Sequence, residues 1–65
     1  ERQPIAVYGR CLLTNTQPTQ QQTVRFINTL RRYAPYRRAV GRIGSNLAAR
    51  QQLQNEIARR VASGE

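Results

Sequence analysis

Six arginines lie between residues 25 and 42 with no acidic residue among them: Arg25, Arg31, Arg32, Arg37, Arg38 and Arg42. A guanidinium group presents a rigid fork of N–H donors that fits two oxygens of one phosphate. Like charges at this density repel one another and destabilise a compact chain unless a polyanion binds them. The segment therefore predicts a binding site for the phosphate backbone of a nucleic acid.

Two tyrosines lie inside this basic segment, between the pairs Arg31-Arg32 and Arg37-Arg38. Tyr33 and Tyr36 could stack on exposed bases or on ribose. A place in a core or an interface is the favoured interpretation of both, because Tyr36 begins an apolar stripe. The candidate nucleic-acid-binding residues are the six arginines with both tyrosines. Phosphate contacts carry no base information, so DNA, RNA and any target sequence stay undistinguished.

The rest of the chain adds little net charge. Its eleven arginines and three glutamates give a formal net charge of +8. Residues 1–24 and residues 46–65 each carry a net +1, so the other six charges belong to the arginine segment. A basic run can also be a solvated helix face, and the use of arginine without lysine can reflect genome composition. Nucleic-acid binding is the interpretation that accounts for the concentration of charge.

The same composition argues against catalysis. The only carboxylate side chains are Glu1, Glu56 and Glu65, and the chain has no histidine or lysine. General acid–base catalysis needs such groups, and Cys11 lacks the base that usually activates a thiol. One cysteine without histidine cannot form the usual four-ligand zinc site, and no glycine-rich phosphate loop is present. We therefore expect no enzyme activity, cofactor, metal or small-molecule substrate, and interpret Cys11 as a small apolar residue.

Membrane insertion is not predicted either. The longest apolar runs are about three residues, such as Cys11 to Leu13, far below the length of a spanning helix or an export signal. A single cysteine without an export signal favours a reducing compartment. The expected location is intracellular, in the cytoplasm or nucleoid, or within a virion or nucleoprotein particle. Whether Glu1 is a native or a processed terminus is left open.

A mainly α-helical single domain over residues 1–65 must position these side chains. The pattern predicts short helices near 20–34, 36–44 and 46–62. In the first of them, Val24, Ile27 and Leu30 follow helical spacing. Pro35 disfavours continuation of that helix and suits the first turn of the next.

The glycines after Pro35 leave two arrangements open. One is a single long helix from Pro35 to Ala62. The other is a pair of helices with a break near Gly44, which we favour because glycine weakens a helix interior and Ser45 or Asn46 can cap a new one. Thr19 is a candidate N-cap for the preceding helix, with Gln22 three residues later completing a capping box.

The N-terminal segment has a different pattern. Residues 5–13 alternate in a way that is compatible with a short β-strand or arm, and residues 14–19 form a polar linker. A strand followed by helices, with Gly44-Ser45 before the last one, resembles the ribbon-helix-helix DNA-binding family. That resemblance implies a dimer whose paired strands enter the major groove. The candidate strand departs from the family because it carries only Arg10 as a charged side chain.

Chain length adds an expectation about assembly. A domain of 65 residues buries too little surface for more than marginal stability. We therefore expect an obligate oligomer or a subunit of an assembly. The first functional candidate is a small nucleic-acid-binding homo-oligomer. The alternatives are a structural subunit of a virion, nucleoprotein or ribonucleoprotein, and a basic amphipathic membrane-active peptide.

Overall fold

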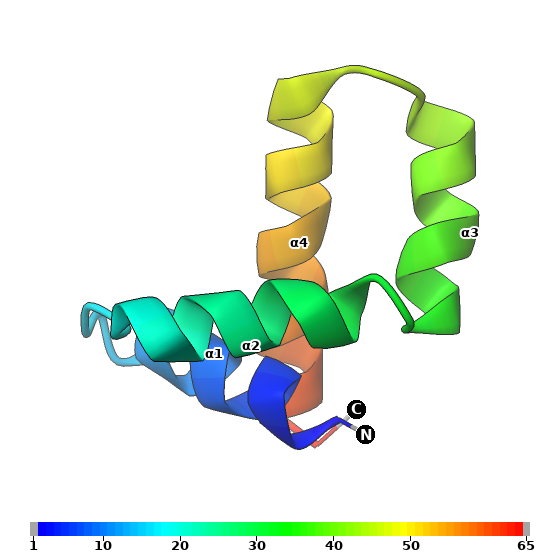
Figure 1. Ribbon diagram of the computed structural model, residues 1–65. Coiled ribbons are helices and arrows are strands. Elements are labelled where there is room, and N and C mark those ends of the chain that lie inside the picture. The colour runs from blue at the N-terminus through cyan, green and yellow to red at the C-terminus, as the bar shows by residue number, and fades with distance from the viewer. Residues whose placement is uncertain (1, 65) are drawn as a thin grey trace.

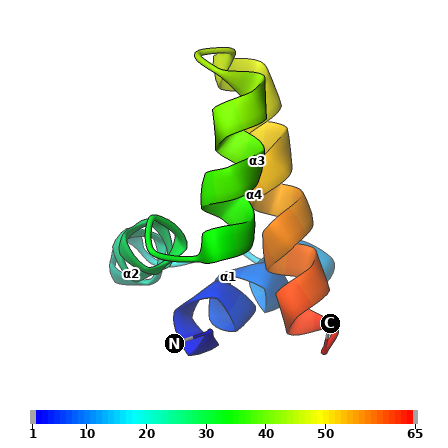
Figure 2. The same ribbon diagram turned by 90° about the vertical axis from the view of Figure 1, so that its right-hand side faces the viewer.

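The computed structural model describes residues 2–64, which form four α-helices and no β-strand. They are α1 (Gln3–Leu13), α2 (Gln20–Leu30), α3 (Ala34–Ile43) and α4 (Leu47–Ala62). Helix α1 packs against both α2 and α4, and α3 packs against α4. Figures 1 and 2 show α3 and α4 as an antiparallel hairpin, with α1 lying across the C-terminal part of α4. The predicted mainly α-helical class is confirmed.

The predicted strand over residues 5–13 is wrong, because this segment is helix α1. Ile5 and Gly9 are its buried residues, one helical turn apart, and Tyr8 and Leu12 pack beside them. Leu13, which alternation placed on the same face as Ile5, is instead 52% exposed. Burial against α2 and α4 outweighs the weak local preference for a strand. The resemblance to the ribbon-helix-helix family required this strand, and it is wrong as well, since residues 2–64 contain no strand that could pair.

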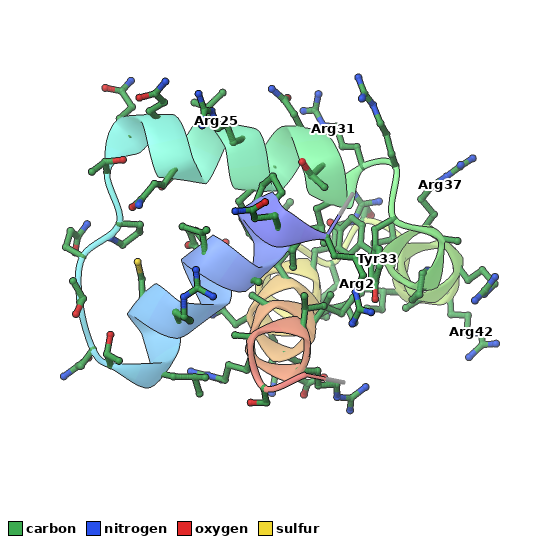
Figure 3. All side chains as sticks on the ribbon, turned by 90° about the horizontal axis from the view of Figure 1, so that it is seen from below. Arg2, Arg25, Arg31, Tyr33, Arg37 and Arg42 are labelled. Carbon is green, nitrogen blue, oxygen red and sulfur yellow. The ribbon has the colours of Figure 1, made fainter. Side chains whose placement is uncertain are left out.

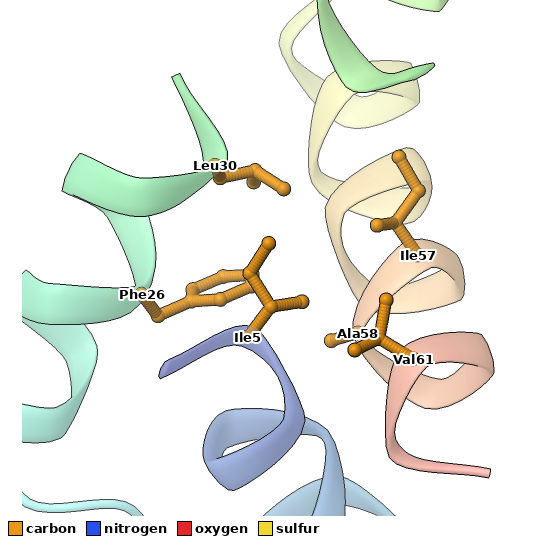
Figure 4. Close-up of a cluster of buried hydrophobic side chains, with 6 residues drawn as sticks. All are labelled: Ile5, Phe26, Leu30, Ile57, Ala58 and Val61. Carbon is orange, nitrogen blue, oxygen red and sulfur yellow. The ribbon is translucent and has the colours of Figure 1, made fainter. Parts of the chain in front are cut away.

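A small apolar core joins α1, α2 and α4 (Figure 4). Its buried members come from these helices alone: Ile5, Phe26, Leu30, Ile57, Ala58 and Val61. The ring of Tyr8 stacks on that of Phe26 with a centroid separation of 4.0 Å and an interplanar angle of 4°. This contact ties α1 to α2 along the side of the core.

Helices α1 and α4 cross very closely at Gly9. A Cβ atom added there would collide with the backbone carbonyl of Ala58 and lie only 2.8 Å from the Cβ of Ala62. Small side chains on both helices therefore permit the crossing. At position 9, glycine is needed because the crossing leaves no space for a side chain. At position 44, glycine is needed because the backbone has a φ of 74°, which other residues rarely adopt.

The predicted caps of two helices are confirmed, at Thr19 and Asn46, whereas α3 begins at Ala34, two residues before the predicted start at residue 36. The Thr19 hydroxyl accepts a hydrogen bond from the Gln22 N–H at 3.1 Å, and the Gln22 side chain accepts one from the Thr19 N–H at 3.0 Å. The Asn46 side chain accepts from the Ala49 N–H at 3.1 Å and so begins α4. Of the two arrangements left open after Pro35, the pair of helices broken near Gly44 is the correct one.

Helix α2 ends at Leu30, four residues before the predicted boundary at residue 34. Proline has no N–H, and its ring clashes with the carbonyl four residues earlier. For Pro35 that carbonyl belongs to Arg31, so residues 31–35 cannot form one regular turn that continues α2. Tyr33 takes an extended conformation at φ −82° and ψ 113°, and α3 then begins at Ala34.

Helix α3 contributes no buried residue and depends on α4 for its position. The Gln54 side-chain amide donates a hydrogen bond to the Tyr36 hydroxyl at 3.1 Å. At the other end of the hairpin, the Nε of Arg50 donates to the Gly44 carbonyl at 2.6 Å. Within residues 2–64, no helix has the length and apolar character required to cross a bilayer.

The close crossing predicts opposite effects of alanine at two glycines. Gly9→Ala should lower the free energy of unfolding by about 1–3 kcal/mol, because the added methyl group overpacks the contact with Ala58. Gly41→Ala should raise it by about 1 kcal/mol, because Gly41 has open surroundings and alanine is the better helix former. Urea denaturation followed by circular dichroism measures both. Equal shifts in the same direction would contradict the assigned crossing.

Candidate nucleic-acid interface

Two helices and the turn between them carry the six arginines of the basic segment. Arg25 lies on α2, Arg31 and Arg32 lie in the turn that follows it, and the remaining three lie on α3. All six side chains are exposed. We call this set the arginine face: Arg25, Arg31, Arg32, Arg37, Arg38 and Arg42.

The core determines the direction of the arginines near α2. Phe26 and Leu30 point into the core and are 1% exposed. The same rotation of the helix leaves Arg25 exposed at the edge facing α1, where it lines a shallow depression with Gln3 and Pro4. Figure 3 shows Arg31 extending outward from the turn after α2. The amphipathic pattern of this segment thus becomes a basic outer surface.

Helix α3 also has a partly buried apolar side and an exposed basic side, and its apolar side faces α4. Tyr36, Val40 and Ile43 are half-buried, whereas Arg37, Arg38 and Arg42 are exposed. Figure 3 shows Arg37 and Arg42 extending from α3 away from the other helices. The arginine face therefore bends around the α2–α3 corner and does not converge on a closed pocket.

The electrostatic environment of the arginine face is strongly positive. Glu56 is the only carboxylate side chain within residues 2–64, so most of the arginine charge in this part of the chain is uncompensated. Arg37 and Arg38 lie in the N-terminal half of α3, whose first turn holds no acidic residue. The positive end of the helix dipole therefore adds to their charge. Such a surface attracts anions and repels other cations.

The two candidate tyrosines are placed differently from the arginines. Tyr33 and Tyr36 are both half-buried and pack against the core cluster. Tyr33 lines a shallow depression with Pro35 and Ile57, and the Tyr36 hydroxyl is bound by Gln54. All six arginines are exposed, whereas both tyrosines are held partly within the fold.

Gly41 also belongs to this surface, although by itself the sequence marks it only as a weak point in a helix. It is exposed on α3, and no atom lies within 4 Å of where its Cβ would be. Its helical spacing from Arg37 and Arg38, four and three residues earlier, is the signal that could have identified it. Because Gly41 has no side chain, the helix backbone between the arginines of α3 is exposed there.

Residues able to bind a metal do not gather in the described part of the chain. Within residues 2–64, no group of three or more His, Cys, Asp or Glu side chains could hold a metal ion. Cys11 is a half-buried free thiol whose Sγ lies 4.0 Å from Oε1 of Gln22. Its position on α1, beside the first turn of α2, agrees with the interpretation as a small packing residue.

Comparison with known proteins found no matching family model, no matching curated protein and no matching solved structure.

The placement of Tyr36 predicts a structural role for its hydroxyl. Tyr36→Phe should lower the free energy of unfolding by about 0.5–1.5 kcal/mol, because the Gln54 side chain loses its partner. Gln54→Ala should cost a similar amount, and the double variant should cost less than the sum of the two single changes. Thermal and urea denaturation measure this cycle. Strictly additive losses would contradict the hydrogen bond.

Proposed function

We propose that the protein binds nucleic acid, contacting the phosphate backbone through the arginine face. The observation that carries the proposal is the exposure of all six arginines on the outer surface of α2, α3 and the turn between them. Because residues 2–64 contain only one carboxylate side chain, folding leaves most of the positive charge of the arginines available to a partner. A nucleic-acid partner implies a location that contains one, in the cytoplasm, the nucleoid or a nucleoprotein particle.

The mechanism is electrostatic. Each arginine that contacts a phosphate releases condensed counterions, so affinity falls as salt rises. For duplex DNA, the slope of log K against log salt is about −0.9 per phosphate contact. Binding through the whole arginine face would thus give a slope of about −5. The fold already fixes the backbone that carries the arginines, so the conformational entropy lost on binding is that of their side chains.

A matched pair of double variants tests the proposal. Arg37→Gln/Arg38→Gln should weaken binding and make the salt slope shallower by about 2, because two phosphate contacts are lost. Arg59→Gln/Arg60→Gln removes the same charge from exposed neighbouring positions on α4 and should have a smaller effect. Combining Arg31, Arg32, Arg37 and Arg38→Gln should flatten the slope further. Fluorescence anisotropy with a labelled nucleic acid across salt concentrations measures these slopes.

Two results would contradict this function. One is the absence of binding by the unaltered protein even at low ionic strength. The other is an equal loss from both double variants, which would indicate attraction to net charge without a defined face.

A second candidate is a structural subunit that assembles into a homo-oligomer or a larger nucleoprotein particle. Its support is exposed apolar surface: Leu13 is 52% exposed, Val24 is 51% exposed and Leu47 is 78% exposed. Leu47 also borders an open groove with Ile27, Tyr36 and Val40. A neighbouring subunit could bury these side chains and add to the stability of a small core.

This candidate predicts self-association that depends on Leu47. Sedimentation velocity should show dimers or larger species at micromolar concentration, and Leu47→Gln should shift the distribution toward the monomer. Gln52→Asn, on an exposed position of the same helix, is the control. A monomer at every concentration, both with and without nucleic acid, would contradict the assembly function and leave the nucleic-acid function intact.

A further inference from the structure

We infer that the nucleic acid is duplex DNA and that the exposed side of α3 lies in its major groove. This inference rests on the proposed function and specifies its partner. It depends on three properties of α3: the order of residues around its outer side, its position at the edge of the molecule and the absence of a side chain at Gly41.

The arginines occupy separate angular positions on the exposed side of α3. At about 100° per residue, Arg37 and Arg42 lie at the two edges of this side, about 140° apart. Arg38 and Gly41 lie between them, and Tyr36 and Val40 lie opposite, toward α4. A helix in the major groove has a phosphate backbone on each side and base edges beneath it. Arg37 and Arg42 can therefore reach opposite backbones while Arg38 faces the bases.

The location of α3 makes this approach sterically open. In Figure 1, α3 forms the right-hand edge of the molecule, α4 stands beside it, and α1 and α2 extend toward the opposite edge. Figure 3 shows Arg37 and Arg42 extending beyond that edge. The major groove of B-form DNA is about 12 Å wide and admits one α-helix. Because nothing lies within 4 Å of a Cβ built on Gly41, the helix backbone is uncovered where the bases would lie.

Other nucleic acids fit this side less well. The major groove of an A-form RNA duplex is deep and narrow, so a helix cannot enter it. Single-stranded nucleic acids are typically held by aromatic side chains stacked on the bases. Tyr33 and Tyr36 are half-buried, and the Tyr36 hydroxyl is bound by Gln54. The arrangement on α3 thus favours duplex DNA.

A charge-neutral substitution separates groove insertion from general attraction to phosphate. Gly41→Leu should weaken binding to a DNA duplex about tenfold, because its side chain holds the helix backbone away from the base edges. It should leave binding to an RNA duplex of the same sequence unchanged. Gln52→Leu, the same type of change on exposed α4, should affect neither. The unfolding midpoint of Gly41→Leu should stay equal or rise, since leucine is the better helix former.

Anisotropy titrations at one fixed salt concentration, with DNA duplex, RNA duplex and single-stranded DNA, measure the preference directly. The expected result is tightest binding to the DNA duplex, with the Gly41→Leu loss confined to it. Equal affinity for both duplexes, tighter binding to the single strand, or full DNA affinity of Gly41→Leu would overturn the inference while retaining the proposed function. Failure to bind any of the three polymers at low salt would overturn the proposed function as well.

Discussion

The close crossing of α1 and α4 at Gly9 is the contact on which the arrangement depends. The backbone of α1 approaches the Ala58 carbonyl so nearly that no Cβ fits at Gly9. This crossing brings Ile5 against Ala58 and Val61, and α2 completes the core with Phe26 and Leu30. A bulky residue at Gly9 would separate the two helices, and dispersion contacts in a core of six side chains would be lost together.

The basic surface follows from this core. Since Phe26 and Leu30 must face inward, the remaining sides of α2 and its turn are available to Arg25, Arg31 and Arg32. Helix α3 adds no buried residue and is held through α4, so its outer side can be given almost entirely to charge. The apolar contacts and the cationic groups thus occupy opposite sides of the same helices. Salt screens the repulsion among these exposed guanidinium groups, and bound phosphate would reduce it further.

Several structural features could be predicted from local chemistry. The Thr19–Gln22 capping box, the Asn46 cap and the break near Gly44 depend on neighbouring residues alone. The concentration of positive charge between residues 25 and 42 is visible in the sequence alone. The end of α2 was misplaced because the effect of Pro35 reaches back four residues, to the carbonyl of Arg31.

The sequence by itself determined helical class after residue 19, the cap residues and the concentration of positive charge, because these follow from side chains close together in the chain. Only the tertiary structure decided that residues 3–13 are helical, since Ile5 and Gly9 meet partners more than forty residues away on α4. It also decided how the arginines on α2 and α3 are oriented relative to one another. That orientation depends on packing between distant helices, which no local pattern encodes.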